Sequence, residues 1–252
     1  MPEYVTLRIK RQDGPDTAAY WQTFHVDYQP QMNVTTCLQL IALKPVTADG
    51  QKTTPVAYDA ACLEEVCGSC TMNINGKVRQ ACSTLVDNLL KEDPNVITLE
   101  PMYKYPVKRD LAVDRSRMFN DLKRLKAWVP VDGYYDLGPG PKMSPKQQQQ
   151  LYPYSRCMTC GCCTEACPQY TRENQFVGAF AISLTVLFNS HPTGAVLKEE
   201  RLGELMKPGG ISECGQAQNC LRVCPKGVPN VTGIAQGYRQ VTVQWFKGLF
   251  SR

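Results

Sequence analysis

The sequence has few of the features that mark several large protein classes. Only two histidines occur among 252 residues, and neither a glycine-rich phosphate-binding fingerprint nor a nucleophile–base pair is present. Residues 1–11 have no apolar stretch of secretory length, so we expect no signal peptide. The longest apolar run, residues 177–188, is too short for a membrane span and suits a buried helix. No catalytic site built from side chains alone is therefore expected.

Cysteine, in contrast, is abundant, with 13 in the chain. The odd number argues against a fully paired disulfide framework. In a reducing compartment, which fits a chain without a secretory segment, clustered cysteines indicate metal binding rather than disulfides. The length predicts one or two domains, and the hydrophobic fraction of 43% is typical of a soluble globular protein.

The first hundred residues have the pattern of strands around one helix. Val5, Leu7 and Ile9 alternate with polar residues, and Asn33 can cap a helix that ends before Pro45. Strands are expected at 5–9, 21–27, 71–74, 77–79 and 96–100, with a helix at 34–43 and a tight Asn75-Gly76 turn. The pattern predicts a small α+β domain that ends near residues 105–112.

The second half is helical in its periodicity. Met118, Leu122 and Leu125 predict an amphipathic helix from near Asp114, and residues 132–145 form a loop rich in helix breakers. Further helices are expected at 178–189, 199–206 and 231–247. The last of these carries an apolar stripe, interpreted as core packing rather than as a binding face: Ile234, Tyr238, Val241 and Trp245.

The first cysteine group is Cys62-x4-Cys67-x2-Cys70, followed by Cys82. This is the plant-type spacing for a [2Fe–2S] cluster. Gly68 lets the backbone turn its N–H groups toward sulfur, and Cys82 closes the site from the far side of the predicted hairpin. A structural zinc site is the alternative, but zinc sites favour two Cys-x2–4-Cys knuckles. The spacing predicts that these four cysteines bind [2Fe–2S].

The second and third groups belong together. The run Cys157-x2-Cys160-x2-Cys163-x3-Cys167-Pro168 is of the bacterial ferredoxin type, in which the fourth cysteine serves the other cluster of a two-cluster domain. The partner run has the form Cys214-x5-Cys220-x3-Cys224-Pro225. Cross-ligation assigns Cys157, Cys160, Cys163 and Cys224 to a [4Fe–4S] cluster, and Cys167, Cys214 and Cys220 to a further cluster.

The further cluster has only three thiolates. Alignment of the two runs places Ala217 where a second cysteine would stand. Three ligands and an alanine at the fourth corner predict a [3Fe–4S] cluster. A [4Fe–4S] cluster with a ligand other than cysteine is the alternative, which Ala217 cannot supply.

Two cysteines and the two histidines remain. Cys37 is expected to be a small buried hydrophobe, and Cys162, although next to a ligand, is not needed by the repeat, so both are treated as non-ligands. His25 is expected to be structural. His191 is either an exposed loop histidine or a proton-handling group at a redox partner site.

The formal net charge of +5 counts every cysteine as neutral. Three clusters with their thiolates, each carrying roughly −2, bring it to about −1, so no nucleic-acid partner is expected. The basic residues gather in residues 104–126, interleaved with aspartates. This segment is interpreted as a solvated helix face or, alternatively, as a docking surface for an acidic partner.

The order of the three cysteine groups resembles the iron–sulfur subunits of succinate dehydrogenase and fumarate reductase, the family of respiratory complex II. Residues 62–70 (CLEEVCGSC), residues 109–114 (RDLAVD) and both Cys-Pro segments carry the resemblance, which covers essentially the whole chain. It implies an α+β fold. An N-terminal β-grasp [2Fe–2S] ferredoxin domain would occupy residues 1–112, and an α-helical ferredoxin domain with the [4Fe–4S] and [3Fe–4S] clusters residues 113–252.

The resemblance also implies a function and partners. The chain would relay single electrons in a succinate:quinone oxidoreductase of the tricarboxylic acid cycle. One partner is a flavoprotein that holds FAD and the dicarboxylate site, and the other is a hydrophobic membrane anchor, often with haem. A quinone lies near the [3Fe–4S] end. The chain would be peripheral, on the cytoplasmic face of the inner membrane, with no transmembrane segment of its own.

One departure bears on the quinone. In many relatives that use ubiquinone, tryptophans follow the Cys-Pro of the second group and a histidine follows the first cysteine of the third group. Here Gln169 follows Pro168, and Gly215 stands at the histidine position. Residues 188–194 look like the branch commonly found in menaquinone users. The resemblance therefore favours menaquinone, with Pro168 and His191 as the quinone-side candidates.

Three alternatives remain open. A fumarate reductase subunit would work in the opposite direction, which the potentials of the cofactors decide. A free multi-cluster ferredoxin is a second alternative, although residues 110–150 and 231–252 are long for a bare carrier. A soluble dicarboxylate reductase with thiol donors is a third, without an additional cysteine-rich domain to support it.

Overall fold

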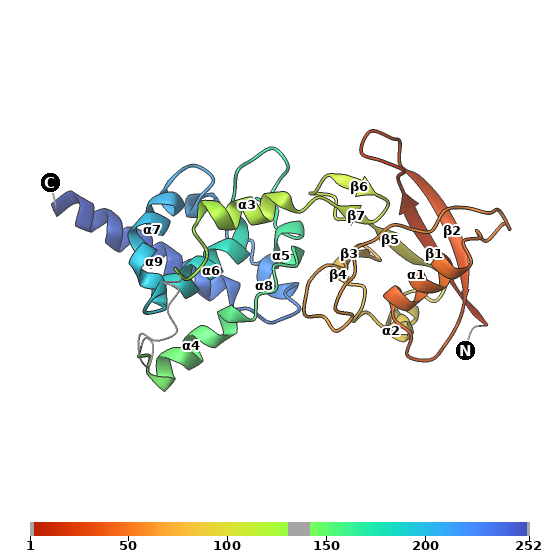
Figure 1. The fold of residues 1–252 in the computed structure, drawn as a ribbon, viewed down its shortest axis with the longest axis horizontal. Helices are drawn as coiled ribbons and strands as arrows, with labels where there is room; N and C mark the ends of the chain where they lie inside the picture. Colours follow the sequence, from red (N-terminus) through yellow and green to blue (C-terminus); the bar gives the residue numbers. More distant parts are fainter. Residues whose placement is uncertain (1–2, 131–141, 251–252) are drawn as a thin grey trace. The chain divides into compact units, whose positions relative to one another are not determined.

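A computed structural model describes residues 3–130 and 142–250 of the chain (Figure 1). The contacts divide the chain into two compact units. The first unit comprises Met1–Arg115 together with Cys160–Glu165, and the second comprises Ser116–Thr159 and Ala166–Arg252. The loop predicted at 132–145 lies largely outside the described residues.

The first unit is built on a five-stranded mixed sheet with the order β2-β1-β5-β3-β4. The strands are β1 (Tyr4–Arg11), β2 (Tyr20–Asp27), β3 (Thr71–Ile74), β4 (Lys77–Gln80) and β5 (Ile97–Glu100). β1 pairs parallel with β5, and the other pairs are antiparallel. The α+β fold with an N-terminal ferredoxin-type sheet, predicted from the sequence, is confirmed.

One face of this sheet carries the core of the first unit. The alternation on β1 buries Val5, Leu7 and Ile9, as the sequence predicted. α1 (Val34–Leu43) packs into the same core, and its N-cap is Asn33, whose side chain accepts a hydrogen bond from the N–H of Thr36 at 2.9 Å. The expected helix is therefore confirmed together with its cap.

The sequence did not predict several short elements. α2 (Val86–Glu92) begins after Leu85, which makes no side-chain cap, so the local signal for a helix start is missing. β6 (Val107–Arg109) and β7 (Ala112–Val113) form a separate two-stranded sheet. α5 (Cys162–Glu165) belongs to the first unit, although the sequence analysis counted these residues with the second half.

A buried ion pair fixes the end of β1. Arg11 and Asp110 have fully buried side chains, and Nε of Arg11 donates to Oδ1 of Asp110 at 2.8 Å. The same carboxylate accepts from the backbone N–H of Gln12 at 3.1 Å and of Ala57 at 2.8 Å. The negative charge is thus met by three donors from two segments, the end of β1 and the backbone at Ala57.

The second unit is helical. Its helices are α3 (Ser116–Arg124), α4 (Pro145–Ser155), α6 (Gly178–Ser190), α7 (Lys198–Met206), α8 (Asn219–Arg222) and α9 (Asn230–Phe250), with two short 3-10 turns, η1 (Gly194–Leu197) and η2 (Ile211–Glu213). The predicted helices at 178–189, 199–206 and 231–247 correspond to α6, α7 and α9. α4 was not predicted.

α6 is the central helix of the second unit. It packs against α9, α4 and α7, and nearly all of its residues are buried, as expected for the apolar run at 177–188. Among the described residues, no single helix has the length and apolar composition to cross a membrane. Only α6 taken together with Gly194–Met206 meets that description, as a pair bent by 118°.

The apolar stripe on α9 is only partly core. Ile234 is buried and Tyr238 is half-buried, but Trp245 is 54% exposed. The interpretation of the whole stripe as core packing is therefore wrong for its C-terminal end, because α9 extends beyond the helices against which its first turns pack.

Three cations of the basic segment 104–126 make contacts inside the protein. At these positions the segment is therefore not a solvated face or a docking surface. The guanidinium of Arg117 lies 3.9 Å from the ring centroid of Tyr170, and Arg124 donates to the backbone carbonyl of Pro208 at 2.7 Å. Lys104 is buried in the first unit. These cations hold loops of the chain in place.

Candidate metal centres

The first cysteine group lies on a loop that the backbone bends sharply. Leu63 and Glu65 have positive φ angles of 59° and 56°, and Gly68 has 72°. For residues with side chains this conformation costs free energy, and such strain is typical of loops that form a functional site. The loop ends at Cys70, directly before β3, and Cys82 follows β4. The hairpin thus brings the four cysteines to one end of the sheet.

Backbone N–H groups converge on the sulfur atoms of this loop. Sγ of Cys62 accepts from the N–H groups of Glu64, Val66 and Cys67 at 3.2–3.4 Å. Sγ of Cys67 accepts from Ser69 at 3.4 Å. Such donors stabilise the negatively charged thiolate, the form that binds iron. The donor set therefore fits an iron–sulfur cluster.

The acidity of the thiols reflects these donors. Burial on its own would raise the pKa of the Cys67 thiol, but hydrogen bonds from the side chain and N–H of Ser69 outweigh it and lower that pKa to about 6. Burial raises the pKa of the Cys70 thiol to about 12. Arg115 fixes the loop from its other side by donating to the carbonyl oxygens of Gly68 and Ser69.

The set of Cys157, Cys160, Cys163 and Cys224, predicted from the sequence, contains residues of both units. Cys160 and Cys163 belong to the first unit, and Cys157 and Cys224 to the second. Hydrogen bonding from Cys162 lowers the pKa of the Cys160 thiol against the effect of burial, and the charge of Arg115 adds to it. Within the second unit, Sγ of Cys224 accepts from the N–H of Val228 at 3.3 Å.

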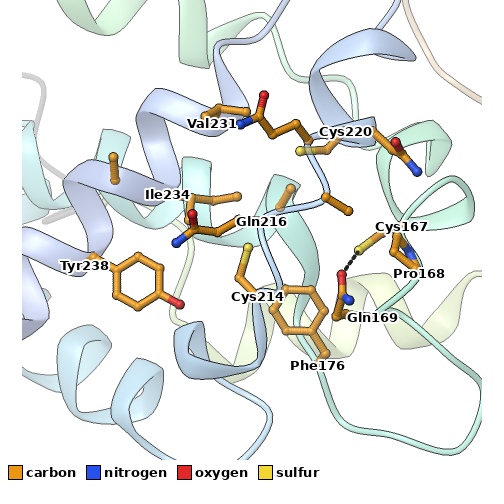
Figure 2. Close-up of a pocket in the computed structure, with 15 residues that line it drawn as sticks. Cys167, Pro168, Gln169, Phe176, Cys214, Gln216, Cys220, Val231, Ile234 and Tyr238 are labelled. Atoms are coloured by element: carbon orange, nitrogen blue, oxygen red, sulfur yellow. Dashed lines mark hydrogen bonds between the residues drawn. The ribbon is translucent and has the colours of Figure 1, made fainter.

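The three cysteines of the third set lie in one cavity of the second unit. Cys167, Cys214 and Cys220 line a space of about 120 Å³, and Figure 2 shows their sulfur atoms on its wall. Ala217, at the corner where the aligned run would have a cysteine, lines the same cavity. Burial, and then the charges of Cys167 and Cys214, raise the pKa of the Cys220 thiol to about 11.

Neutral side chains complete this cavity. Oε1 of the Gln169 amide lies 3.9 Å from Sγ of Cys167 and accepts from its thiol (Figure 2). A Cβ on Gly215 would lie 2.6 Å from Nε2 of Gln169, so a larger residue there would require this flexible side chain to move. Tyr238 also contributes to the wall and donates to the carbonyl of Ile211 at 2.8 Å. The three thiols and the small neutral corner fit a cluster with three cysteine ligands.

The structure separates the two quinone-side candidates. Pro168 lines the cavity with the three thiols, whereas His191 does not. His191 ends α6, and its Nδ1 accepts from the N–H of Gly194 at 3.2 Å. That bond stabilises the turn after α6.

The remaining cysteines have ordinary surroundings. Cys37 is fully buried in α1, and burial raises its pKa to about 12, as for a small apolar side chain. Cys162 is buried and accepts from Nε2 of Gln80 at 3.4 Å. No three His, Cys, Asp or Glu side chains are arranged to hold a single metal ion in the part of the chain that the structure describes.

Two neighbours of the thiols, Arg115 and Gln169, were not predicted from the sequence. Arg115 was counted only within the basic segment, and no local pattern indicates that its guanidinium would hold the Gly68 carbonyl. Gln169 was noted only as a departure from the ubiquinone pattern. Its position directly after Cys167-Pro168 is the signal that could have placed its side chain near a thiol.

Two family models match the chain. The model described as a 2Fe-2S iron-sulfur cluster binding domain matches residues 6–120. The model described as a 4Fe-4S dicluster domain matches residues 153–228. Together they cover the segments that carry all three cysteine groups.

Known proteins resemble the chain over its whole length. It is 51% identical to the succinate dehydrogenase iron-sulfur subunit of Bacillus subtilis over 252 residues, which cover 99% of this chain and 98% of that protein. It is 29% identical to the fumarate reductase iron-sulfur subunit of Wolinella succinogenes, covering 93% and 96%. A chain of the Mycobacterium smegmatis Sdh1 complex in the apo form has the same fold, with a TM-score of 0.78, 98% of both chains covered and 22% identity.

Proposed function

Because the chain belongs to the family of succinate dehydrogenase and fumarate reductase iron–sulfur subunits, we propose that it is the electron-transfer subunit of a succinate:quinone oxidoreductase. The observation that carries this proposal is full-length similarity together with the cavity that Cys167, Cys214, Cys220 and Ala217 line. The dicarboxylate chemistry belongs to a partner flavoprotein with FAD.

Three clusters are proposed for the chain, and when bound they supply one-electron transfer. The [2Fe–2S] ligands are Cys62, Cys67, Cys70 and Cys82, the [4Fe–4S] ligands are Cys157, Cys160, Cys163 and Cys224, and the [3Fe–4S] ligands are Cys167, Cys214 and Cys220. The convergent N–H groups on Cys62 and Cys67 support the first set. Domains at 1–112 and 113–252 are part of the same proposal.

The chain's own residues control the surroundings of the thiols. Arg115 holds the loop of the first group in shape, and the Gln169 amide lies against Cys167. The N–H donors to Cys62 and Cys67 would stabilise the more negative, reduced state of a bound cluster and so raise its potential. The third site combines apolar side chains, such as Phe176 and Ile234, with neutral polar ones.

The membrane side of the proposal rests on the third site. A hydrophobic anchor, with or without haem, and a quinone, menaquinone in our proposal, would lie beyond the [3Fe–4S] cavity, on the side of Pro168. The chain is then peripheral, at the cytoplasmic face of the membrane. His191, which caps a turn, is the weaker of the two quinone-side candidates.

The deciding experiment is affinity purification of the tagged chain from its own host after solubilising the membranes in detergent. Co-purification of a flavoprotein and small hydrophobic subunits is expected. Recovery of the chain alone from the soluble fraction, with its clusters intact, would overturn the proposal in favour of a free carrier.

Fumarate reduction is the second candidate, favoured by the similarity to the Wolinella succinogenes subunit. The purified complex is assayed in both directions, with succinate and a quinone analogue and with fumarate and a quinol. Faster succinate oxidation supports the proposal, whereas faster fumarate reduction supports the second candidate.

A further inference from the structure

A groove in the second unit is distinct from the cavity that holds the three thiols. It has a volume of about 660 Å³ and lies between α4, the end of α6, the start of α7 and one face of α9. The α9 residues that line it recur at three- and four-residue spacing, from Gln236 to Lys247, so they form one stripe of that helix. No cysteine lines it.

The groove is strongly cationic. Lys146 of α4, Lys198 of α7 and Arg239 and Lys247 of α9 line it. No aspartate or glutamate lines it in the part of the chain that the structure describes. α4, α6 and α9 contain no acidic residue at all. Four positive charges therefore face one space without a negative charge between them.

These cations are not used elsewhere. None of the four takes part in an ion pair among the described residues. Two of the three acids of α7 form ion pairs outside the groove, Glu200 with Lys126 and Glu204 with Arg124 and Lys207, and the third, Glu199, does not line it. By contrast, the buried Arg201 of the same helix is held by backbone carbonyls and an amide. The groove keeps its charge available for a ligand.

The polar wall between the cations is held in shape. Gln147 donates to the carbonyl of Ser190 at 2.9 Å, and Asn189 donates to Oε1 of Gln240 at 2.9 Å. These bonds join α4 and α9 to the end of α6. The cations are thus mounted on a preformed scaffold, which lowers the cost of binding.

One end of the groove is apolar. Val243 lines the groove and is itself about half exposed. The last turns of α9 carry Trp245, Phe246, Leu249 and Phe250, each at least half exposed, on either side of Lys247. Aromatic side chains beside lysines are the composition of segments that sit at the membrane–water interface.

We propose that this groove binds the phosphate head group of an anionic phospholipid, with the apolar end of α9 against the start of its acyl chains. The four unpaired cations fit the negative phosphate, and the aromatic rim fits a lipid rather than a free phosphate ion. Binding to a membrane lipid rests on the proposed function only in requiring that the chain works at a membrane.

The test uses the full chain with its clusters reconstituted and flotation with two kinds of vesicle, phosphatidylcholine alone and phosphatidylcholine mixed with phosphatidylglycerol. We expect binding to the mixed vesicles only. A variant with Lys146, Lys198, Arg239 and Lys247 each changed to Gln is expected to bind them at least about tenfold more weakly. The cluster EPR signals, which report on the proposed function, stay unchanged.

A matched variant separates the groove from general charge. It changes the exposed lysines of the first unit, Lys44, Lys52, Lys91 and Lys108, to Gln. We expect it to keep most of the binding. An equal loss of vesicle binding in both variants would overturn the proposal, because binding would then depend on the total positive charge and not on the groove. A charge-retaining Arg239→Lys variant is expected to bind like the unchanged chain.

Two competitors define the ligand. Inorganic phosphate is expected to displace the vesicles only weakly, and a polyglutamate peptide is expected not to compete. Groove-dependent binding of inorganic phosphate without binding of phosphatidylglycerol vesicles would overturn the proposal in favour of a soluble anion. Preferential binding of polyglutamate would overturn it in favour of an acidic protein segment.

Discussion

Two regions of the molecule, the donor-rich segments around Cys62 and Asp110 in the first unit and the buried groups of the second unit, treat a negative charge in different ways. In the first unit the charge is met by several donors at bonding distance, three N–H groups on Cys62 and an arginine with two N–H groups on Asp110. In the second unit burial dominates and raises the pKa of Cys220 to about 11 and that of Asp121 to about 6.

This difference has a physical meaning. A group surrounded by donors is prepared for its charged form before any ligand arrives. A group surrounded by apolar atoms stays neutral until a cation compensates it. The loop of Cys62 and Cys67 is thus preorganised for thiolates. The buried Cys70 of the same group, like Cys220 of the second unit, would depend on a bound metal for its charge balance.

The largest expected effect is that of Cys62→Ala. It removes the sulfur on which three N–H groups converge, so we expect loss of the [2Fe–2S] cluster, about two of nine irons per chain, while the centres of the second unit remain. Iron analysis and EPR of the reduced protein measure this. Cys37→Ala, at a buried helix thiol, is the control and keeps all clusters. A surviving [2Fe–2S] signal in Cys62→Ala contradicts the assignment.

Next is Ala217→Cys, which adds a thiol to the wall of the cavity. A fourth ligand is expected to admit a fourth iron and lower the potential of that centre. EPR of the oxidised protein checks this, because an oxidised [3Fe–4S] centre is paramagnetic and an oxidised [4Fe–4S] centre is not. Ala217→Val changes the volume without adding a ligand and should keep the signal. An unchanged signal and potential in the cysteine variant would count against the [3Fe–4S] assignment.

Asp110→Ala tests the buried carboxylate of the first unit that is surrounded by hydrogen-bond donors. It leaves the fully buried Arg11 without a carboxylate, at a cost of about 3–5 kcal/mol in the free energy of unfolding. Denaturant unfolding of the full chain measures the change. Glu100→Ala, which breaks the partly exposed pair with Lys10, should cost less than about 1 kcal/mol. A similar loss of unfolding free energy in the two variants would show that a buried ion pair is no more costly to break than an exposed one, which contradicts this prediction.

Asp121→Asn tests the carboxylate of the second unit whose pKa is raised mainly by burial. Burial raises the pKa of Asp121 to about 6 despite Arg117 at 4.0 Å and Tyr170 at 3.4 Å, so the folded state keeps a proton that the unfolded chain releases near pH 4. Stability therefore falls as the pH rises from 4 to 6, by at most about 3 kcal/mol.

The asparagine variant should lack this fall, so its advantage over the unchanged chain is larger at pH 7 than at pH 4.5. Thermal unfolding at both pH values measures it, with the exposed Asp16→Asn as control. A difference between variant and parent that is the same at both pH values would contradict the raised pKa.

Local signals explain what the sequence predicted well. The Asn33 cap and the Asn75-Gly76 turn act within a few residues, and both α1 and the β3–β4 hairpin appear where expected. The cysteine spacings likewise placed Cys167, Cys214 and Cys220, which line one cavity. Their role as cluster ligands stays a prediction.

Long-range contacts explain the failures. Nothing near Glu165 in the sequence indicates that its buried carboxylate would accept from Asn73 at 2.9 Å and from the N–H of Tyr103 at 2.8 Å. Those bonds help to hold Cys160–Glu165 in the first unit. The exposed end of α9 was misjudged for a similar reason, because helical periodicity does not indicate where the packing partners of a helix end.

The first unit consists of two segments that are separated in the sequence, and this affects how it folds during synthesis on the ribosome. The amide of Asn73 and the N–H of Tyr103 are synthesised long before the Glu165 carboxylate that they bind. At roughly 5–20 residues per second, residues 116–159 delay that partner by several seconds. During this interval the sheet lacks the contacts that Cys160–Glu165 makes with the first unit. The first unit therefore reaches its final form only after Glu165 has been synthesised, when the ribosome is already adding Cys167 and the residues that follow it.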